Sequence, residues 1–187
     1  MNAQTIYNIL RAGGLSRAGA LGMLGNLMAE SSLIPNIVQR GMQSLSDEEY
    51  TRLVDAGVKN FEDSCGFGLA QFTFYSRKRA LLQFARSQGV SVGDGEMQCH
   101  FIIKELKEDF PGLYRMLCES EDIGLCSDRV CDTYERPAVN NFQTRRSFAY
   151  QFEQQVFDEM PEPPSDDRLE RVLALLDELR EILKEVL

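Results

Sequence analysis

The sequence predicts a mainly α domain with one small β-hairpin, followed by a C-terminal helix of the coiled-coil type. Three observations carry this prediction. Apolar residues recur at helical spacing in segment after segment up to residue 158. A stretch over residues 60–75, with glycines at 66 and 68, interrupts that pattern and suits a hairpin. Beyond residue 166, apolar residues repeat at alternating intervals of three and four.

Capping residues and stop signals divide the first half of the chain into four helices. Ser16 is a good N-cap, Ser46 opens a capping box with Glu49, and Gly57 and Gly89 are typical C-terminal stops. Residues 33–45 lack periodicity and read as a loop. The predicted helices span residues 5–11, 16–30, 46–56 and 76–88, the last capped by Ser76.

The second half continues with helices separated by short breaks. Pro111 favours the first turn of a helix, Ser120 is a candidate cap, and Pro137 ends the helix before it. The predicted helices span residues 95–109, 111–119, 120–136 and 142–158.

A proline-rich segment then divides the chain into two parts. Residues 160–165 hold three prolines and form a stiff linker. Residues 166–187 carry an unbroken apolar heptad seam from Leu169 to Val186, and a lone helix of this length is marginal in water. The domains are therefore residues 1–159 and a helix over 166–187 that self-associates or docks on another protein. Packing of this helix back on its own domain is the alternative.

Glu30 is the first candidate for chemistry. It ends a mostly apolar helix, with Leu27 and Met23 one and two turns before it. An apolar surround and the negative end of the helix dipole both favour the protonated carboxyl. A glycosidase needs such a carboxyl to protonate its leaving oxygen. The alternative is an ordinary solvated acid at a helix end.

The segment Gly66–Phe72, GFGLAQF, is the second candidate. Its glycines allow a polymer to approach the backbone closely. The amide of Gln71 can hydrogen-bond a sugar substituent, and Phe67, Phe72 and Tyr75 can stack on sugar faces. The alternative is that these aromatic rings close a small core.

These segments, in this order, resemble the phage tail lysozyme family of the lysozyme-like superfamily, which is related to goose-type lysozymes and lytic transglycosylases. The resemblance rests on an Asn-x-x-x-Glu-Ser helix end, a following Gly-Leu-Ala-Gln, a basic SRKRALLQFA helix and a late YERP segment. It covers roughly residues 4–157. Phe72 stands where the family often has Trp, which keeps a stacking ring and removes an indole donor.

The resemblance implies a lysozyme-like α+β fold and cleavage of the β-1,4 bond between N-acetylmuramic acid and N-acetylglucosamine (MurNAc–GlcNAc) in peptidoglycan. Glu30 would be the general acid. Glycosidases commonly pair the acid with a second carboxylate, and Glu62 and Asp63 lie just before the turn-forming glycines, with Asp63 preferred for its closeness to them. Glu135 is a rival, and its alternative reading is an ion pair with Arg136 or Arg145. The related goose-type lysozymes and lytic transglycosylases use one essential glutamate, so a second carboxylate is not required. The implied substrate-binding residues are Ser31, Gln71, Phe72, Tyr75 and Tyr134.

Two other functions stay open at this point. One is a lytic transglycosylase rather than a hydrolase. The other is an inactive structural or binding module that works through its tail. In either case the resemblance implies a virion tail protein acting at the bacterial cell wall, with residues 166–187 contacting a second copy or another tail protein.

Composition narrows the classes of partner and cofactor that this chain can have. The net charge of −9 argues against nucleic acid as a partner. The sequence shows no membrane span and no signal peptide, so we expect synthesis in the host cytoplasm. Five irregularly spaced cysteines suggest reduced thiols, and one histidine supplies a zinc site poorly, so no metal or cofactor is expected. A nucleophilic pair of Cys65 with His100 is the weaker alternative to a glycosidase.

Overall fold

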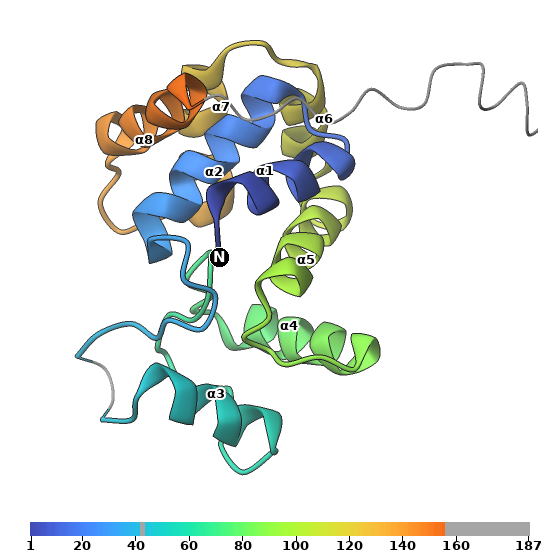
Figure 1. Ribbon diagram of the computed structural model, residues 1–187, viewed down its shortest axis with the longest axis vertical. Coiled ribbons are helices and arrows are strands. Elements are labelled where there is room, and N and C mark those ends of the chain that lie inside the picture. Colours follow the sequence, from blue (N-terminus) through green and yellow to red (C-terminus); the bar gives the residue numbers. More distant parts are fainter. Residues whose placement is uncertain (42–43, 156–187) are drawn as a thin grey trace, which may run out of the picture. The chain divides into compact units, whose positions relative to one another are not determined.

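The structure is a computed structural model that describes residues 1–41 and 44–155. These residues form eight α-helices and one π-helical segment (Figure 1). The elements in chain order are α1 (Ala3–Ala12), α2 (Arg17–Ser31), α3 (Asp47–Asp55), α4 (Tyr75–Gln88), α5 (Gly95–Glu108), α6 (Pro111–Glu119), α7 (Ile123–Arg129), the π-helix η1 (Val130–Glu135) and α8 (Phe142–Gln154). The predicted mainly α class is confirmed.

Local capping explains most of the helix starts. The Ser16 hydroxyl accepts a hydrogen bond from the Gly19 N–H at 2.9 Å, as expected for the start of α2. Two predicted caps are wrong. Helix α4 begins directly after Phe74 with no side-chain cap, so Ser76 lies inside it. Helix α7 is capped by Asp122, whose side chain accepts a hydrogen bond from the Leu125 N–H. The Ser120 hydroxyl accepts from the Asp122 N–H, before the helix begins.

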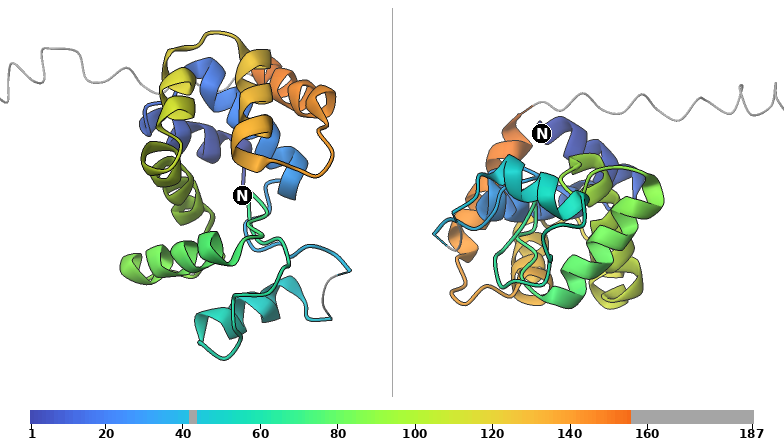
Figure 2. Two further views of the ribbon diagram at one scale, coloured as in Figure 1. Left: turned by 180° about the vertical axis from the view of Figure 1, so that it is seen from behind. Right: turned by 90° about the horizontal axis from the view of Figure 1, so that it is seen from below.

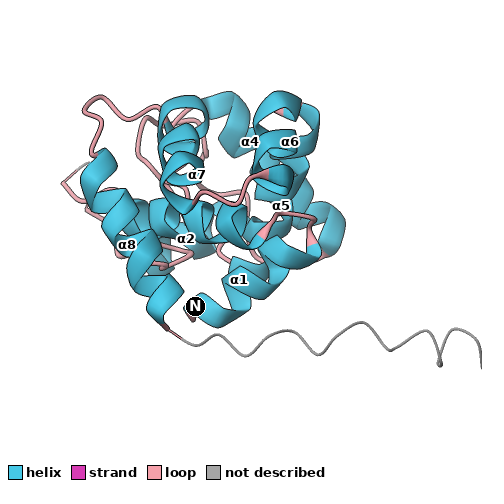
Figure 3. Ribbon diagram, turned by 90° about the horizontal axis from the view of Figure 1, so that it is seen from above, coloured by secondary structure: helices cyan, strands magenta, loops and turns pink. Residues whose placement is uncertain are grey.

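The predicted hairpin is reduced to a tight turn. The backbones of Phe67 and Phe72 exchange hydrogen bonds of 3.2 and 2.8 Å, and an isolated bridge joins Phe67 to Val38. The described residues contain no strand, and Figure 3 shows only helices and loops. The cause is local, because Gly68 (φ 77°) and Gln71 (φ 43°) both take left-handed backbone conformations and curl the chain before a second pair can form.

Helix α2 runs through the helical core. It packs most extensively against α8 and α7, and also contacts α1, α6 and η1; Figures 1 and 2 show α7 and α8 next to each other and against α2. Three glycines one turn apart allow this. A methyl group at Gly19 would lie 2.0 Å from the carbonyl oxygen of Leu117, and one at Gly22 would lie 2.7 Å from the Ser127 nitrogen. One at Gly25 would lie 2.6 Å from the Arg145 carbonyl oxygen, so neighbouring backbones touch α2 directly.

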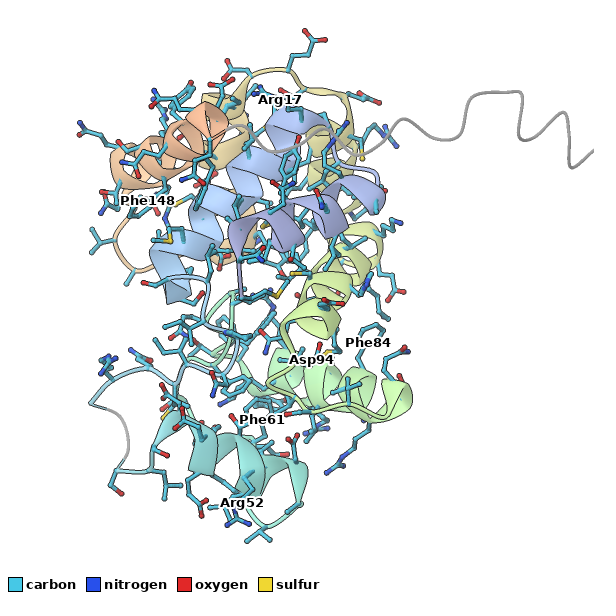
Figure 4. The ribbon with its side chains drawn as sticks, in the orientation of Figure 1. Arg17, Arg52, Phe61, Phe84, Asp94 and Phe148 are labelled. Atoms are coloured by element: carbon cyan, nitrogen blue, oxygen red, sulfur yellow. The ribbon has the colours of Figure 1, made fainter. Side chains whose placement is uncertain are left out.

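A second cluster joins α3 to the turn. The rings of Tyr50, Phe61 and Phe67 pack together with centroids 5.1 to 6.1 Å apart, and Figure 4 shows Phe61 between α3 and the rest of the described chain. On α5, the buried amide of Gln98 accepts from the Leu69 N–H and donates to the carbonyls of Pro35 and Val92. These contacts fix the turn against α5.

Residues Met1–Val156 form one unit of the chain. The predicted linker (160–165) and heptad helix (166–187) lie outside the described residues. Within the described part, every helix is too short or too polar to cross a membrane.

Candidate active site

The end of α2, the turn after Gly66, the start of α4 and the segment after η1 together line a cavity of about 550 Å³. It brings together two carboxyl groups, two guanidinium groups and several amide and hydroxyl groups. The lining residues are Glu30, Gln39, Ser64, Gly66, Ala70, Gln71, Thr73, Phe74, Arg77, Glu135, Arg136, Pro137 and Ala138.

Glu30 lies in the last turn of α2, and 18% of its side chain is exposed. Arg145 of α8 donates from Nη2 to Glu30 Oε1 at 2.5 Å and from Nη1 to Asn26 Oδ1 at 3.0 Å. Asn26 precedes Glu30 by one helical turn, so one guanidinium bridges both side chains. The expected apolar surround of Glu30 is therefore wrong: its nearest polar partner is a buried cation.

Glu135 is the second carboxyl group on the cavity. Its Oε1 is buried and has no hydrogen-bond partner within the described residues. Burial raises its pKa well above the ordinary value of 4.5, and the negative charge of Glu30 adds to this effect, while Arg77 and Arg145 oppose it. Burial therefore favours the protonated form of Glu135, which is the form that the sequence analysis expected for Glu30.

A buried polar layer supports the cavity. Arg77 makes two hydrogen bonds to Glu105, of 2.9 and 2.8 Å, and its guanidinium lies over the rings of Phe72 and Tyr134. The Tyr134 hydroxyl donates to Glu105 Oε2 at 2.6 Å. Phe72 is 0% exposed and Tyr134 is 2% exposed. These two predicted substrate-binding rings thus hold Arg77 in place and do not line the cavity.

Of the other predicted substrate residues, only Gln71 lines the cavity. Its Nε2 donates to the carbonyls of Ile37 and Gly68, at 3.3 and 3.1 Å. Ser31 is buried and donates to the Leu27 carbonyl. Tyr75 is exposed beneath Arg79 but is not among the lining residues.

Phe74 is the aromatic ring on the cavity that the sequence argument missed. It is 71% exposed. The available signal in the sequence was that Phe74 lies just before the predicted helix 76–88 and outside its apolar periodicity.

Asp63, the preferred second carboxylate, belongs to a different cluster. It accepts from Lys78 Nζ at 2.6 Å and from the Tyr50 hydroxyl at 3.0 Å, and Lys59 lies 3.3 Å away. Burial alone would raise the pKa of Asp63, but the hydrogen bond and charge of Lys78 hold it below its ordinary value. Asp63 is not among the lining residues, whereas its rival Glu135 is.

The structure gives no support to the cysteine–histidine alternative. Burial raises the pKa of the Cys65 thiol, which favours the less nucleophilic protonated form. His100 is exposed on α5 and borders a separate hollow with Phe84 and Asp94. Across residues 1–41 and 44–155, no three His, Cys, Asp or Glu side chains come together as metal ligands.

Residues 1–155 match the family model described as phage tail lysozyme. The chain belongs to the phage tail lysozyme family. The resemblance carried by the four sequence segments is therefore confirmed. Membership points to a lysozyme-like function on peptidoglycan, in a virion-associated protein that acts at the cell wall.

Proposed function

We propose that this protein cleaves the MurNAc–GlcNAc β-1,4 bond of peptidoglycan strands, with Glu30 as the general acid. The observation that carries the proposal is the position of Glu30: it ends a buried helix and opens onto the 550 Å³ cavity of a chain that matches the phage tail lysozymes. A carboxyl group at such a position can protonate the glycosidic oxygen as the bond to the anomeric carbon breaks.

The chemistry of the cavity supports a glycan ligand. Gln71 uses its amide N–H groups within the protein, which leaves its carbonyl oxygen to accept from a sugar hydroxyl or N-acetyl group. Phe74 offers an exposed ring to the apolar face of a sugar. Arg136, exposed on the same cavity, suits the carboxylate of a muramic acid lactyl or peptide group.

Hydrolysis and transglycosylation share the step in which Glu30 acts. They differ in the hydroxyl group that then attacks, which comes from water in one case and from the sugar itself in the other. The released muropeptides decide between them, because hydrolysis leaves reducing ends and transglycosylation leaves anhydro-sugars.

The decisive experiment is Glu30→Gln. An amide cannot deliver a proton, so we expect glycan cleavage to fall by about 10²–10⁴-fold or more while the fold stays intact. Muropeptide release from purified cell walls measures the activity, and thermal unfolding measures the fold. Glu121→Gln is the matched control, since Glu121 is an exposed glutamate away from the cavity.

Normal cleavage by a folded Glu30→Gln variant would refute the assignment of the acid. Absence of any cleavage by the unaltered protein would favour the inactive binding module instead.

The heptad segment 166–187 completes the proposal. Its unbroken apolar seam suits association with a second copy or with another tail protein, which would hold the enzyme where the tail meets the wall.

A further inference from the structure

The charged groups that act most strongly on Glu135 are already paired with one another. They are the carboxyl groups of Glu30 and Glu105 and the guanidinium groups of Arg77 and Arg145. Arg136, which also lines the cavity, is exposed and donates from Nε to the Thr133 carbonyl oxygen. Arg77 is committed to Glu105 by two hydrogen bonds, and Arg145 is bound to Glu30. Glu135 is left without an ion-pair partner of its own, and its Oε1 has no hydrogen-bond partner in the described part of the chain.

This arrangement creates a difficulty for the proposed acid. Glu30 must carry a proton to cleave the glycosidic bond, yet the structure places its carboxyl group in an ion pair with Arg145 at 2.5 Å. A proton is better accommodated on Glu135, whose Oε1 is buried without a hydrogen-bond partner in the described part of the chain, and burial and the charge of Glu30 both raise the pKa of Glu135. Both side chains line the same cavity.

We propose that Glu30 and Glu135 share one proton, that the free enzyme keeps it on Glu135, and that Glu135 supplies it to Glu30 for catalysis. The inference rests on the proposed role of Glu30. The Glu135 carboxyl gives its proton to the Glu30 carboxylate. Glu30 then passes that proton to the glycosidic oxygen as the C–O bond breaks. The attacking hydroxyl group, from water or from the sugar, then gives its proton to the two carboxyl groups. Glu30 and Glu135 together therefore hold one proton again at the end of each turnover.

The surrounding charges suit such an exchange. Arg145 on α8 acts electrostatically on Glu135 as well as binding Glu30, so its charge stabilises a carboxylate on either residue. Its buried Nε–H has no hydrogen-bond partner within the described residues. Arg77 on α4 also favours the Glu135 carboxylate, whereas Glu105 on α5 opposes it. Within η1, the Tyr134 hydroxyl is already bound to Glu105.

The location of the proton can be measured without activity. Infrared spectra of protein carrying isotope-labelled glutamate should show the C=O band of one neutral carboxyl group at pH 7. The band should disappear in Glu135→Gln and persist in Glu121→Gln. In Glu30→Gln it should titrate at lower pH, because the negative charge that helps hold the proton is gone. A spectrum without this band at pH 7, or a band that survives Glu135→Gln, would overturn the proposal.

The pH dependence of kcat/KM tests the transfer. Glu135→Gln should lower activity at least tenfold at pH 7, with recovery toward the unaltered rate as the pH falls and solvent protonates Glu30 directly. Glu30→Gln should be inactive at every pH, and Glu121→Gln should keep the unaltered profile. A Glu135→Gln protein with the unaltered pH profile refutes the transfer alone. An active Glu30→Gln protein refutes the proposed function itself.

Folding does not obscure this test. An amide is a neutral replacement for a neutral carboxyl, so Glu135→Gln should unfold at a temperature no lower than the unaltered protein at pH 7. If that variant fails to fold, the infrared titration of Glu30→Gln still decides.

Discussion

Lys78 and Asp63 show how a charged residue can serve the fold. The Lys78 side chain is 0% exposed, and its ammonium group binds Asp63 and the Cys65 carbonyl oxygen, at 2.6 and 3.1 Å. A buried ammonium group without a counter-charge is very costly, so Asp63 is committed to neutralising Lys78. This ion pair anchors the start of α4 to the segment before the turn, and so supports one wall of the cavity.

Asp63→Asn should therefore destabilise the fold more than it affects the chemistry. We expect a loss of roughly 2–4 kcal/mol at pH 7, below the full cost of breaking a completely buried pair because Asp63 is 28% exposed. The pKa of Asp63 is depressed, so its contribution is present above its ordinary value of 3.8 and is lost as the pH falls through the folded-state value.

Chemical denaturation at several pH values measures this effect, and the gap between the two proteins should close in strong acid. Glu62→Gln, which removes the exposed pair with Arg79, is the control and should cost under about 1 kcal/mol. Equal effects of the two changes would contradict the role of Asp63.

Sequence reasoning found part of the candidate site and misassigned the rest for one reason. Glu30 and Gln71 were predicted from their local settings, and both line the cavity. Phe72 and Tyr134 were assigned to the substrate, but a ring suits a sugar and a buried guanidinium equally well, and only tertiary packing reveals Arg77 between them. Arg145 follows Glu30 by 115 residues, so no local pattern could predict that pair.

At the scale of elements, the close approach of helices to α2 sets the geometry of the site. Gly25 lets the backbone of α8 touch α2 at Arg145, whose side chain then reaches Asn26 and Glu30. The glycines thus act on the chemistry through the position of one neighbouring helix.

Gly25→Ala should displace α8. The added methyl group meets backbone atoms, so we expect a loss of about 1–3 kcal/mol in stability. We also expect a several-fold loss of cleavage, because Arg145 would no longer hold the side chains of Asn26 and Glu30 in position. Thermal unfolding and muropeptide release measure the two effects. Gly112→Ala on α6 is the control, because a methyl group there meets nothing within 4 Å and should be neutral or slightly stabilising. A fully active and stable Gly25→Ala protein would contradict this account.

Helix existence was predictable from caps and periodicity, whereas the turn was not. Pro111 and Glu119 bound α6 as predicted, because a Pro at the first turn is a strong local signal. The hairpin prediction failed because a left-handed Gln71 leaves no sequence signal: glutamine rarely adopts that conformation, and here hydrogen bonds to Ile37 and Gly68 accompany it.

At the scale of the molecule, the described unit is expected to function alone. The family match spans residues 1–155, and Met1–Val156 form one unit. A chain ending at residue 159 should therefore fold, stay monomeric and keep cleavage that depends on Glu30. Sedimentation of this chain beside the full one measures association, and muropeptide release measures activity. Aggregation of the shortened chain, together with a monomeric full chain, would show that residues 160–187 complete the core.

Because other helices enclose α2, the two sides of the cavity should unfold at different free energies. Amide hydrogens of α2 lie beneath α1, α6, α7, η1 and α8, so they can exchange with deuterium only in rare openings of the whole core. The turn that carries Gln71 is held by two isolated bridges, a few backbone hydrogen bonds and the Gln98 side chain, without a helix of its own, and can open at lower free energy. On heating, the amide hydrogens of the turn that carries Gln71 should thus exchange first, and the turn should open while α2 stays folded. Cleavage activity should therefore be lost at a lower temperature than the helical circular-dichroism signal.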